Sequence, residues 1–216
     1  MIEFISKFSK FFGLFCLVLI GLLTYFSIKY KFFSAINVEE LKLGSGSLLF
    51  IPYKGDYTKI REPLLKVKQE LLEAFGTNFK LFGIYYDSPA LIEDKNESRA
   101  IIGGCFDLSC DLQPFLLKHP NYKITTFKNL QGFGAKFPLL TPLNVLSAVI
   151  RGYPKIMAYG IKKQLTFKAQ CSLEFYDYNE KSMTIAFPYY QGNESILFQS
   201  GYPIPKSKNV ESNKRD

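Results

Sequence analysis

The chain has 216 residues, 47% of them apolar, and 27 basic against 19 acidic residues, which is too apolar for a disordered protein and too charged for several membrane spans. One histidine and four cysteines leave few ways to build a zinc site or a histidine-based triad, so no metal, cofactor or catalytic residue is expected. The net charge of +8 divides into +3 for residues 1–31, +2 for 203–216 and +3 spread without a cluster over 32–202, which disfavours nucleic acid as a partner.

An uncharged apolar segment lies near the N-terminus. Residues 11–28 carry no charge and are bounded by Lys10 and Lys29. Eighteen helical residues at about 1.5 Å each cover about 27 Å, enough for a thin bilayer. A cleaved signal peptide is the alternative, but the segment exceeds the usual apolar region and no small-x-small cleavage site follows it. We therefore expect residues 1–31 to form a retained single-pass anchor in a lipid bilayer.

Lysines flank this segment on both sides, so its orientation depends on a small difference. Lys7 and Lys10 precede it, and Lys29, Lys31 and Lys42 follow within a short reach. The positive-inside rule therefore leans slightly toward a cytosolic C-terminal part. The three cysteines outside the segment agree weakly, because secreted scaffolds usually pair theirs.

The first half of the soluble part, residues 46–110, follows a predicted juxtamembrane linker over residues 32–45. Asp56 is a typical helix N-cap and Gly76 a typical stop, and Pro63 requires the helix proper to begin near it. Apolar spacing and turn residues predict strand, helix, strand and strand over residues 46–52, 57–75, 79–86 and 99–104.

The second half, residues 120–190, repeats this order. Thr141 and Pro142 read as a helix cap and first helical position, and Gly152-Tyr153-Pro154 predicts a break or kink within that helix. Residues 191–216 are expected to form a short, polar, basic tail. The predicted elements are strands over 122–128 and 131–137, a helix over 141–165, and strands over 170–176 and 182–189.

The two halves also match in detail, because residues 84–87 align with residues 174–177 at an offset of 90. Two such βαββ units can share one antiparallel sheet with both helices on one face. We therefore expect an α+β domain over residues 46–190 after the N-terminal membrane helix. The opposite face of the sheet, or the seam between the halves, would form a groove.

Glu174 is the leading candidate for a ligand-binding residue. Strand alternation puts Glu174 and Tyr176 on one face and Leu173 and Phe175 on the other. A carboxylate on a dry face would carry a large desolvation cost, so it should face a groove or a partner. The alternative is an exposed glutamate on a half-solvated face. Its counterpart in the alignment is Ile84, which would make the groove chemically asymmetric.

Tyrosines could supply aromatic walls and hydroxyl donors for a flat or cationic ligand, and the candidates are Tyr57, Tyr85, Tyr86 and Tyr176. Most of the 14 tyrosines must be ordinary core or surface residues. Tyr86 and Tyr176 are favoured because they are expected to share the register of Glu174. The predicted ligand-binding residues are therefore Glu174, Tyr176, Tyr86 and Tyr57.

Catalysis is the less favoured interpretation. Glu174 and Tyr176 could in principle activate a water molecule, but residues two apart on a strand are common neighbours. A dyad of His119 with Cys105 or Cys110 would need accidental geometry, and the spacing of these cysteines is no zinc motif. We expect binding without catalysis, with a glutamate–tyrosine hydrolase as the residual alternative.

Four short motifs stand in order along the chain, and the N-terminal span adds a fifth feature. The motifs are Gly55-Asp56-Tyr57, Tyr85-Tyr86-Asp87-Ser88-Pro89, Lys136-Phe137-Pro138 and Leu173-Glu174-Phe175-Tyr176. Together these features resemble the GyrI-like (gyrase-inhibitor-like, SOUL-related) family, and most of all its membrane-anchored branch, which includes a testis-expressed receptor for ER-phagy. The resemblance covers about residues 10–190.

The resemblance implies a duplicated βαββ domain in the cytosol, tethered to the endoplasmic reticulum membrane. In soluble relatives the groove binds amphipathic or cationic small molecules against a buried glutamate, which corresponds to Glu174. The membrane-anchored branch implies an adaptor in reticulophagy, with ubiquitin-like autophagy proteins or a segregase-type ATPase as partners. The 26 residues after Tyr190 lack that branch's aromatic-x-x-aliphatic motif, so recruitment would use the folded domain or a second subunit.

Overall fold

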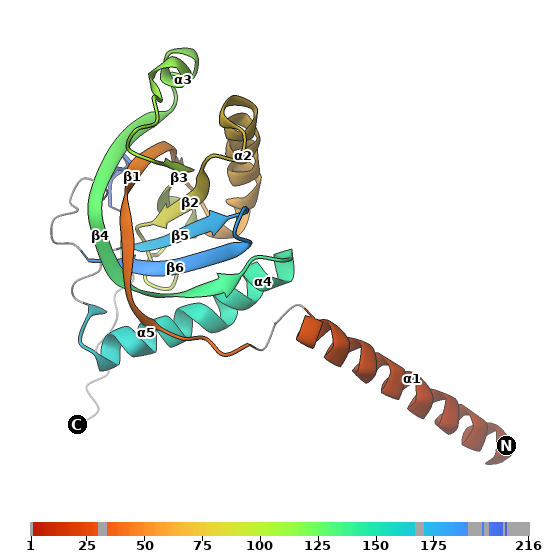
Figure 1. The fold of residues 1–216 in the computed structure, drawn as a ribbon. Helices are drawn as coiled ribbons and strands as arrows, with labels where there is room; N and C mark the ends of the chain where they lie inside the picture. The colour runs from red at the N-terminus through yellow and green to blue at the C-terminus, as the bar shows by residue number, and fades with distance from the viewer. Residues whose placement is uncertain are drawn as a thin grey trace, which may run out of the picture.

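The computed structural model describes residues 2–29, 34–166, 171–189, 196, 199–204 and 206. An N-terminal helix projects away from a body of strands and helices (Figure 1). The helices are α1 (Ile2–Lys29), α2 (Arg61–Phe75), α3 (Gln113–Lys118), α4 (Pro142–Ser147) and α5 (Tyr153–Lys162). The strands are β1 (Glu39–Lys54), β2 (Lys80–Tyr85), β3 (Arg99–Phe106), β4 (Lys123–Pro138), β5 (Ser172–Asp177) and β6 (Ser182–Pro188).

The strands form one antiparallel sheet in the order β1-β3-β2-β5-β6-β4, and β1 also pairs with β4, which closes the sheet into a barrel. Each half contributes strand, helix, strand and strand, and the halves meet where β2 pairs with β5. The predicted α+β class with a duplicated βαββ order is thus confirmed, and this order is consistent with a GyrI-like fold. Barrel closure is the feature that the sequence pattern did not predict.

Closure depends on the length of β1 and β4, each of which has 16 residues. β1 begins at Glu39, so residues 39–45 of the predicted juxtamembrane linker are strand. These residues pair with β4 from Gly134 downward, with register shifts at Lys42 and Gly44 that bend the strand. β4 is likewise one continuous strand where two were predicted. Residues 46–50 also pair with β4, so the extra residues of β1 extend a pairing that removes the sheet's edges.

The two faces of the sheet carry different apolar clusters. One face packs against the helices, with Val67 of α2 and Ile156 of α5 in a cluster that includes sheet residues such as Ile185. The other face carries a second cluster that includes Phe82 and Phe175. Both helices therefore pack on the same face, as predicted.

The second-half helix is interrupted where its proline predicts. α4 and α5 are joined by a π-helical turn over Ala148–Gly152, and Pro154 lies in the first turn of α5. A Cβ at Gly152 would lie 2.5 Å from the Phe137 ring, and one at Gly160 would lie 2.6 Å from the Phe133 ring. These two glycines therefore let the whole segment, here called the α4–α5 arm (residues 142–162), lie close against β4.

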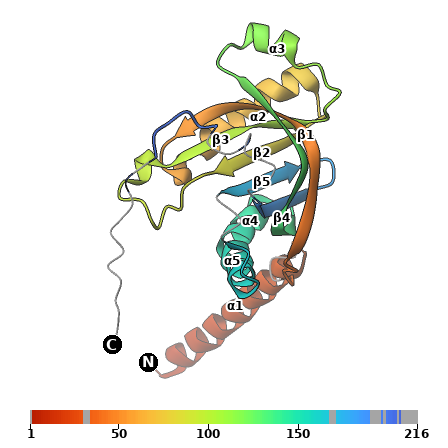
Figure 2. The same ribbon diagram turned by 90° about the vertical axis from the view of Figure 1, so that its left-hand side faces the viewer.

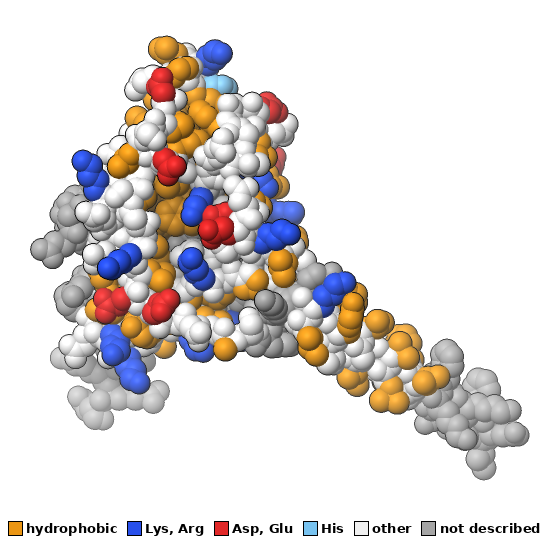
Figure 3. Space-filling view, viewed as in Figure 1, with side chains coloured by type: hydrophobic (Ala, Val, Ile, Leu, Met, Phe, Trp, Pro, Cys, Tyr) orange, Lys and Arg blue, Asp and Glu red, His pale blue; other side chains and the backbone are white. Residues whose placement is uncertain are grey.

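The described residues include one helix that is long and apolar enough to cross a membrane. Its apolar window is Phe12–Lys29 in α1, with a mean hydropathy of 2.0 and no buried residue. Figure 3 shows hydrophobic side chains along this helix. A signal sequence near an N-terminus meets the same test of length and apolarity, so the retained anchor stays a prediction.

Candidate ligand-binding site

A cavity of about 1240 Å³ lies on the helix-covered face of the sheet. One wall comes from the start of α2, with Leu64 and Leu65, and the facing wall comes from the α4–α5 arm, with Val149 and Met157. The floor is formed by β2 and β5 at the seam between the halves. The lining is mostly apolar and aromatic, as is usual for sites that bind small organic molecules.

Glu174 lies on this floor, in the middle of β5. It is opposite Gly83 of β2 and Ile185 of β6, and only 4% of its surface is exposed. Leu173 and Phe175 belong to the apolar cluster of the other face, which confirms the predicted alternation. The carboxylate is therefore placed at the bottom of a cavity, and the alternative of an exposed glutamate is wrong.

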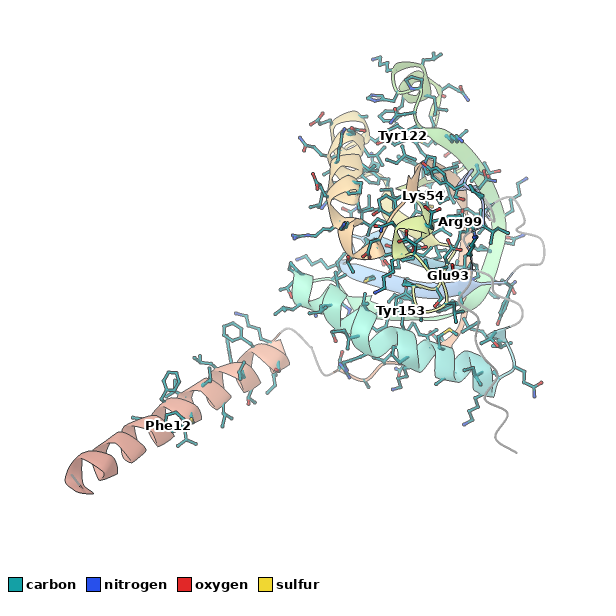
Figure 4. The ribbon with its side chains drawn as sticks, turned by 180° about the vertical axis from the view of Figure 1, so that it is seen from behind. Phe12, Lys54, Glu93, Arg99, Tyr122 and Tyr153 are labelled. Carbon is teal, nitrogen blue, oxygen red and sulfur yellow. The ribbon has the colours of Figure 1, made fainter. Side chains whose placement is uncertain are left out.

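Two tyrosines from different elements hold the carboxylate. The Tyr153 hydroxyl, from the α4–α5 arm, donates to Oε1 at 2.7 Å, and the Tyr176 hydroxyl, from β5 itself, donates to Oε2 at 2.5 Å. Figure 4, where Tyr153 is labelled, shows that residue on the side of the arm that faces the sheet. Tyr153 is also 3.3 Å from the Ser172 hydroxyl. The contact between Tyr153 and Glu174 ties the arm to the cavity floor.

A third tyrosine, Tyr85, reaches the same carboxylate across the seam. Its hydroxyl is a hydrogen-bonding neighbour of both Glu174 and Tyr176. The Tyr85 ring folds back over Gly83, where an added Cβ would lie 2.9 Å from the hydroxyl oxygen. Gly83, directly opposite Glu174, therefore provides the space that this ring occupies.

Burial sets the protonation of this cluster. Desolvation raises the pKa of Glu174 above its usual range, and the hydrogen bonds from Tyr176, Tyr153 and Tyr85 lower it without cancelling the rise. Desolvation, together with the neighbouring carboxylate, also raises the pKa of each of these three tyrosines well above 10. The tyrosines therefore remain hydroxyl donors at neutral pH, and none is a ready base.

The nearest buried cation is already paired. The Arg99 guanidinium donates to Asp87 at 2.8 and 3.0 Å, and both side chains are less than a tenth exposed. No positive charge is among the groups that shift the pKa of Glu174 in the described part of the chain. Arg61 lines the cavity but is exposed on the first turn of α2. The carboxylate is thus hydrogen-bonded but has no countercharge beside it.

Tyr57 forms part of the wall, as predicted. Its hydroxyl donates to the Arg99 carbonyl at 2.5 Å and accepts the Asp87 N–H at 3.3 Å. Its ring meets Tyr85 edge to face, with 5.0 Å between centroids. Because the hydroxyl is engaged with the backbone, Tyr57 offers a ring and no free donor to a ligand.

Tyr86 does not share the register of Glu174, so that part of the prediction is wrong. It lines the cavity but packs against the apolar cluster of the other face, and its hydroxyl donates to the Ile196 carbonyl at 3.0 Å. The offset of 90 between the halves is wrong by one residue in the face that it predicts. Ile84 lies in the apolar cluster of the other face, whereas Gly83 and Tyr85 share the face of Glu174, so Tyr85 takes the place expected for Tyr86.

Sequence reasoning missed Tyr153 and Gly83. Tyr153 lies in the predicted helix break, where it was read only as part of an interruption. A tyrosine beside a break on the buried side of a helix was the available signal. Gly83 carried no signal at all, because its role depends on the strand that pairs with it.

The cysteines have the properties of structural residues. Burial raises the pKa of Cys105 and of Cys171 to about 12, which is opposite to the shift that a nucleophilic thiol needs. His119 stacks on Phe115, with 4.1 Å between ring centroids. Within the described ranges, no group of three or more histidine, cysteine or acidic residues is arranged to hold a metal ion.

No protein-family model matches the chain, and no curated protein matches it. Several solved structures are similar in fold. The EcmrR C-terminal domain is 11% identical, with 71% of this chain and 96% of that one covered and a TM-score of 0.46. SAV2435 bound to tetraphenylphosphonium is 14% identical, with 71% of this chain and 93% of that one covered and a TM-score of 0.41. A structure described as a hydrolase from Listeria innocua is 12% identical, with 76% and 98% covered and a TM-score of 0.45. At these identities and scores the likeness says nothing about what this chain binds or catalyses.

Proposed function

We propose that the chain binds hydrophobic cations in the cavity between α2 and the α4–α5 arm, with the Glu174 carboxylate as the countercharge. The observation that carries the proposal is a carboxylate at the floor of an apolar cavity that accepts hydrogen bonds from tyrosines and has no cation beside it. A ligand with a positive centre and an apolar body would supply both missing partners.

Desolvation makes this preference selective for charge. The raised pKa of Glu174 reflects the cost of an ionised carboxylate in the cavity. A cation offsets that cost, whereas an anion of the same shape would add repulsion in a region of low dielectric. The rings of Tyr57, Tyr85 and Tyr153 add faces on which a cationic centre is attracted by the ring quadrupole.

The volume agrees with a ligand of this kind. Sites for small organic molecules usually span about 300–1,000 Å³. The cavity of about 1240 Å³ is somewhat larger and leaves room for several aromatic rings around one charge. A metal ion or an ammonium ion would leave most of this apolar space unfilled.

We place this domain at a membrane, with α1 as the anchor, supported by the length and composition of Phe12–Lys29. A cytosolic domain at the endoplasmic reticulum follows from the lysine balance and the family resemblance, and it stays a prediction. The adaptor role in reticulophagy, with its autophagy and segregase partners, also stays a prediction, as does the hydrolase alternative. Neither the adaptor role nor the hydrolase alternative explains why a carboxylate without a countercharge lies in this cavity.

The experiment compares two probes that share a shape and differ in charge. Tetraphenylphosphonium and tetraphenylborate are titrated into the full chain in detergent micelles by calorimetry, with empty micelles subtracted. Saturable binding of the cation and none of the anion is expected at pH 8. Equal binding of both ions, or binding of neither, would overturn the proposal.

A further inference from the structure

The α4–α5 arm has a solvent-exposed apolar stripe that nothing in the described chain covers. Ile150, Met157 and Ile161 are 61%, 36% and 65% exposed, and Leu143 and Leu146 earlier in the arm are 54% and 49% exposed. Met157 and Ile161 lie four residues apart on one side of α5, and Ile150 precedes them in the π-helical turn. Ile156 and Gly160 are buried on the sheet-facing side, and the stripe lies beside them, from the lip of the cavity at Met157 out to solvent at Ile161.

A basic stripe runs beside the apolar one. Lys155 and Lys162 fall within a second sector of α5, about a third of a turn from Met157 and Ile161, and Arg151 precedes them in the π-helical turn. Lys155 and Lys162 are exposed. The arm therefore presents three bands around its axis: a buried band, an exposed apolar band and a basic band.

The charge of the whole region is one-sided. Residues 112–173 contain nine basic residues and no acidic residue. The rest of residues 32–202 contains ten basic and sixteen acidic residues. The expectation that charge is spread without a cluster is therefore wrong, because a small net value hid two opposite regions. The arm lies within the positive region.

The arm is also held close to the end of α1. The Arg151 guanidinium donates to the Ser34 carbonyl at 3.3 Å, and Ser34 follows the last residue of α1, Lys29, by five residues. Five extended residues span at most about 18 Å. Figures 1 and 2 both show the C-terminal end of α1 beside the arm. A bilayer crossed by α1 would thus begin within about 18 Å of Ser34, the residue whose carbonyl Arg151 contacts.

We propose that the α4–α5 arm lies on the surface of the bilayer that α1 crosses, with the apolar stripe in the interface and the basic stripe against anionic lipid headgroups. An exposed apolar band flanked by lysine and arginine is what an in-plane interfacial helix presents. Anionic lipid attracts each nearby basic residue, and the absence of acidic residues from 112–173 removes opposing repulsion. The inference rests on the membrane anchor proposed above and does not depend on the ligand.

This placement has a consequence for the cavity. Leu146 and Met157 belong to the exposed part of the arm and also line the cavity wall, together with Val149. The arm is therefore both the membrane-facing surface and one lip of the cavity. A hydrophobic cation that concentrates at an anionic lipid surface would meet the cavity there, without first crossing water.

The absence of tryptophan from the sequence makes a direct test possible, since any introduced tryptophan is the sole one. Ile161→Trp places the probe on the stripe. Leu117→Trp is the matched control, because Leu117 is 84% exposed on α3, at the far end of the domain from the arm (Figure 1). Each full-length variant is reconstituted into vesicles of phosphatidylcholine and phosphatidylglycerol in which the phosphatidylcholine acyl chains are brominated, and no ligand is added.

Bromine quenches tryptophan only on close approach, so the result is read as the ratio of emission in unbrominated and brominated vesicles. We expect at least twofold quenching at residue 161 and a ratio near one at residue 117. Lys155→Glu with Lys162→Glu should reduce quenching at residue 161, and so should high salt, because the headgroup attraction is electrostatic. The cation-binding proposal can fail without affecting this result.

Four outcomes would overturn the inference. Equal ratios at residues 161 and 117 would mean that the arm stays off the lipid. Blue-shifted emission at residue 161 without quenching would mean that protein covers the stripe, such as a second copy. Emission that responds to duplex DNA and not to lipid would assign the basic stripe to nucleic acid. Failure of the chain to float with the vesicles would remove the anchor, and the docking of the arm with it.

Discussion

The hydroxyl of Tyr153 should tune the pH at which the cavity accepts a cation. It donates to Glu174 Oε1 at 2.7 Å and lowers the pKa of that carboxyl against the larger effect of desolvation. Tyr153→Phe removes this donor and leaves the ring, so the apolar wall of the cavity keeps its shape. The pKa of Glu174 should therefore rise further in the variant.

The size of the shift follows from the strength of one hydrogen bond to a charged acceptor. Such a bond contributes about 1.5–3 kcal/mol. At about 1.4 kcal/mol for each pKa unit, its loss raises the pKa of Glu174 by about one to two units. Cation binding requires the ionised carboxylate, so below the midpoint the affinity falls about tenfold for each unit of pH. The variant should bind about 10- to 100-fold more weakly below both midpoints, and equally well above them.

The assay is a calorimetric titration of tetraphenylphosphonium into the full chain in micelles, from pH 4.5 to pH 9. Tyr159→Phe is the matched control, because Tyr159 lies on the same arm and its ring packs near Phe133, with 6.4 Å between centroids. The midpoint of the affinity curve should move to higher pH in Tyr153→Phe and stay in place in the control. An unmoved midpoint, or a shift to lower pH, would refute this reasoning.

Three further variants test the same site. Gly83→Ala puts a Cβ 2.9 Å from the Tyr85 hydroxyl, so the ring should leave Glu174 and the midpoint of the cation-affinity curve should move to higher pH in the same titration; an unmoved midpoint would contradict the role of Tyr85. Asp87→Asn leaves the buried Arg99 charge without its partner, so the free energy of unfolding measured by urea denaturation should fall by about 3–5 kcal/mol. A loss below about 1 kcal/mol would contradict the pairing. Glu174→Gln should flatten the pH dependence of stability. The raised pKa of Glu174 contributes stability that is fully present below the unfolded pKa and is lost as pH rises through the folded pKa. A variant that still loses stability as the parent does, as pH rises above the unfolded pKa, would contradict the assignment.

Local patterns in the sequence predicted most of the fold. Strand alternation put Glu174 on the correct face, and the proline at position 154 marked the helix interruption. Both features depend on residues within a few positions of one another, so the local sequence contains the information. The closure of the barrel cannot be predicted from local sequence, because it pairs the start of β1 with β4, some 90 residues later.

The candidate site was only partly predictable for the same reason. Tyr153 reaches Glu174 because the arm packs on the sheet, and that packing needs glycines at positions 152 and 160. The sequence marked Gly152 only as part of a helix break, and Gly160 carried no pattern of its own. The alignment of the halves matched aromatic identities and so missed the face by one residue. A shift of one reverses every side chain in a strand, which is why Tyr86 replaced Tyr85 in the prediction.

The most direct test of the central claim is the affinity of tetraphenylphosphonium for the Glu174→Gln variant at pH 8, measured beside the unaltered chain. Removing one charge of a buried, hydrogen-bonded pair costs about 2–3 kcal/mol, so we predict a loss of about 30- to 150-fold. Tyr159→Phe should bind as the unaltered chain does. Equal affinity of the Glu174→Gln variant and the unaltered chain would contradict the claim that this carboxylate holds the cation.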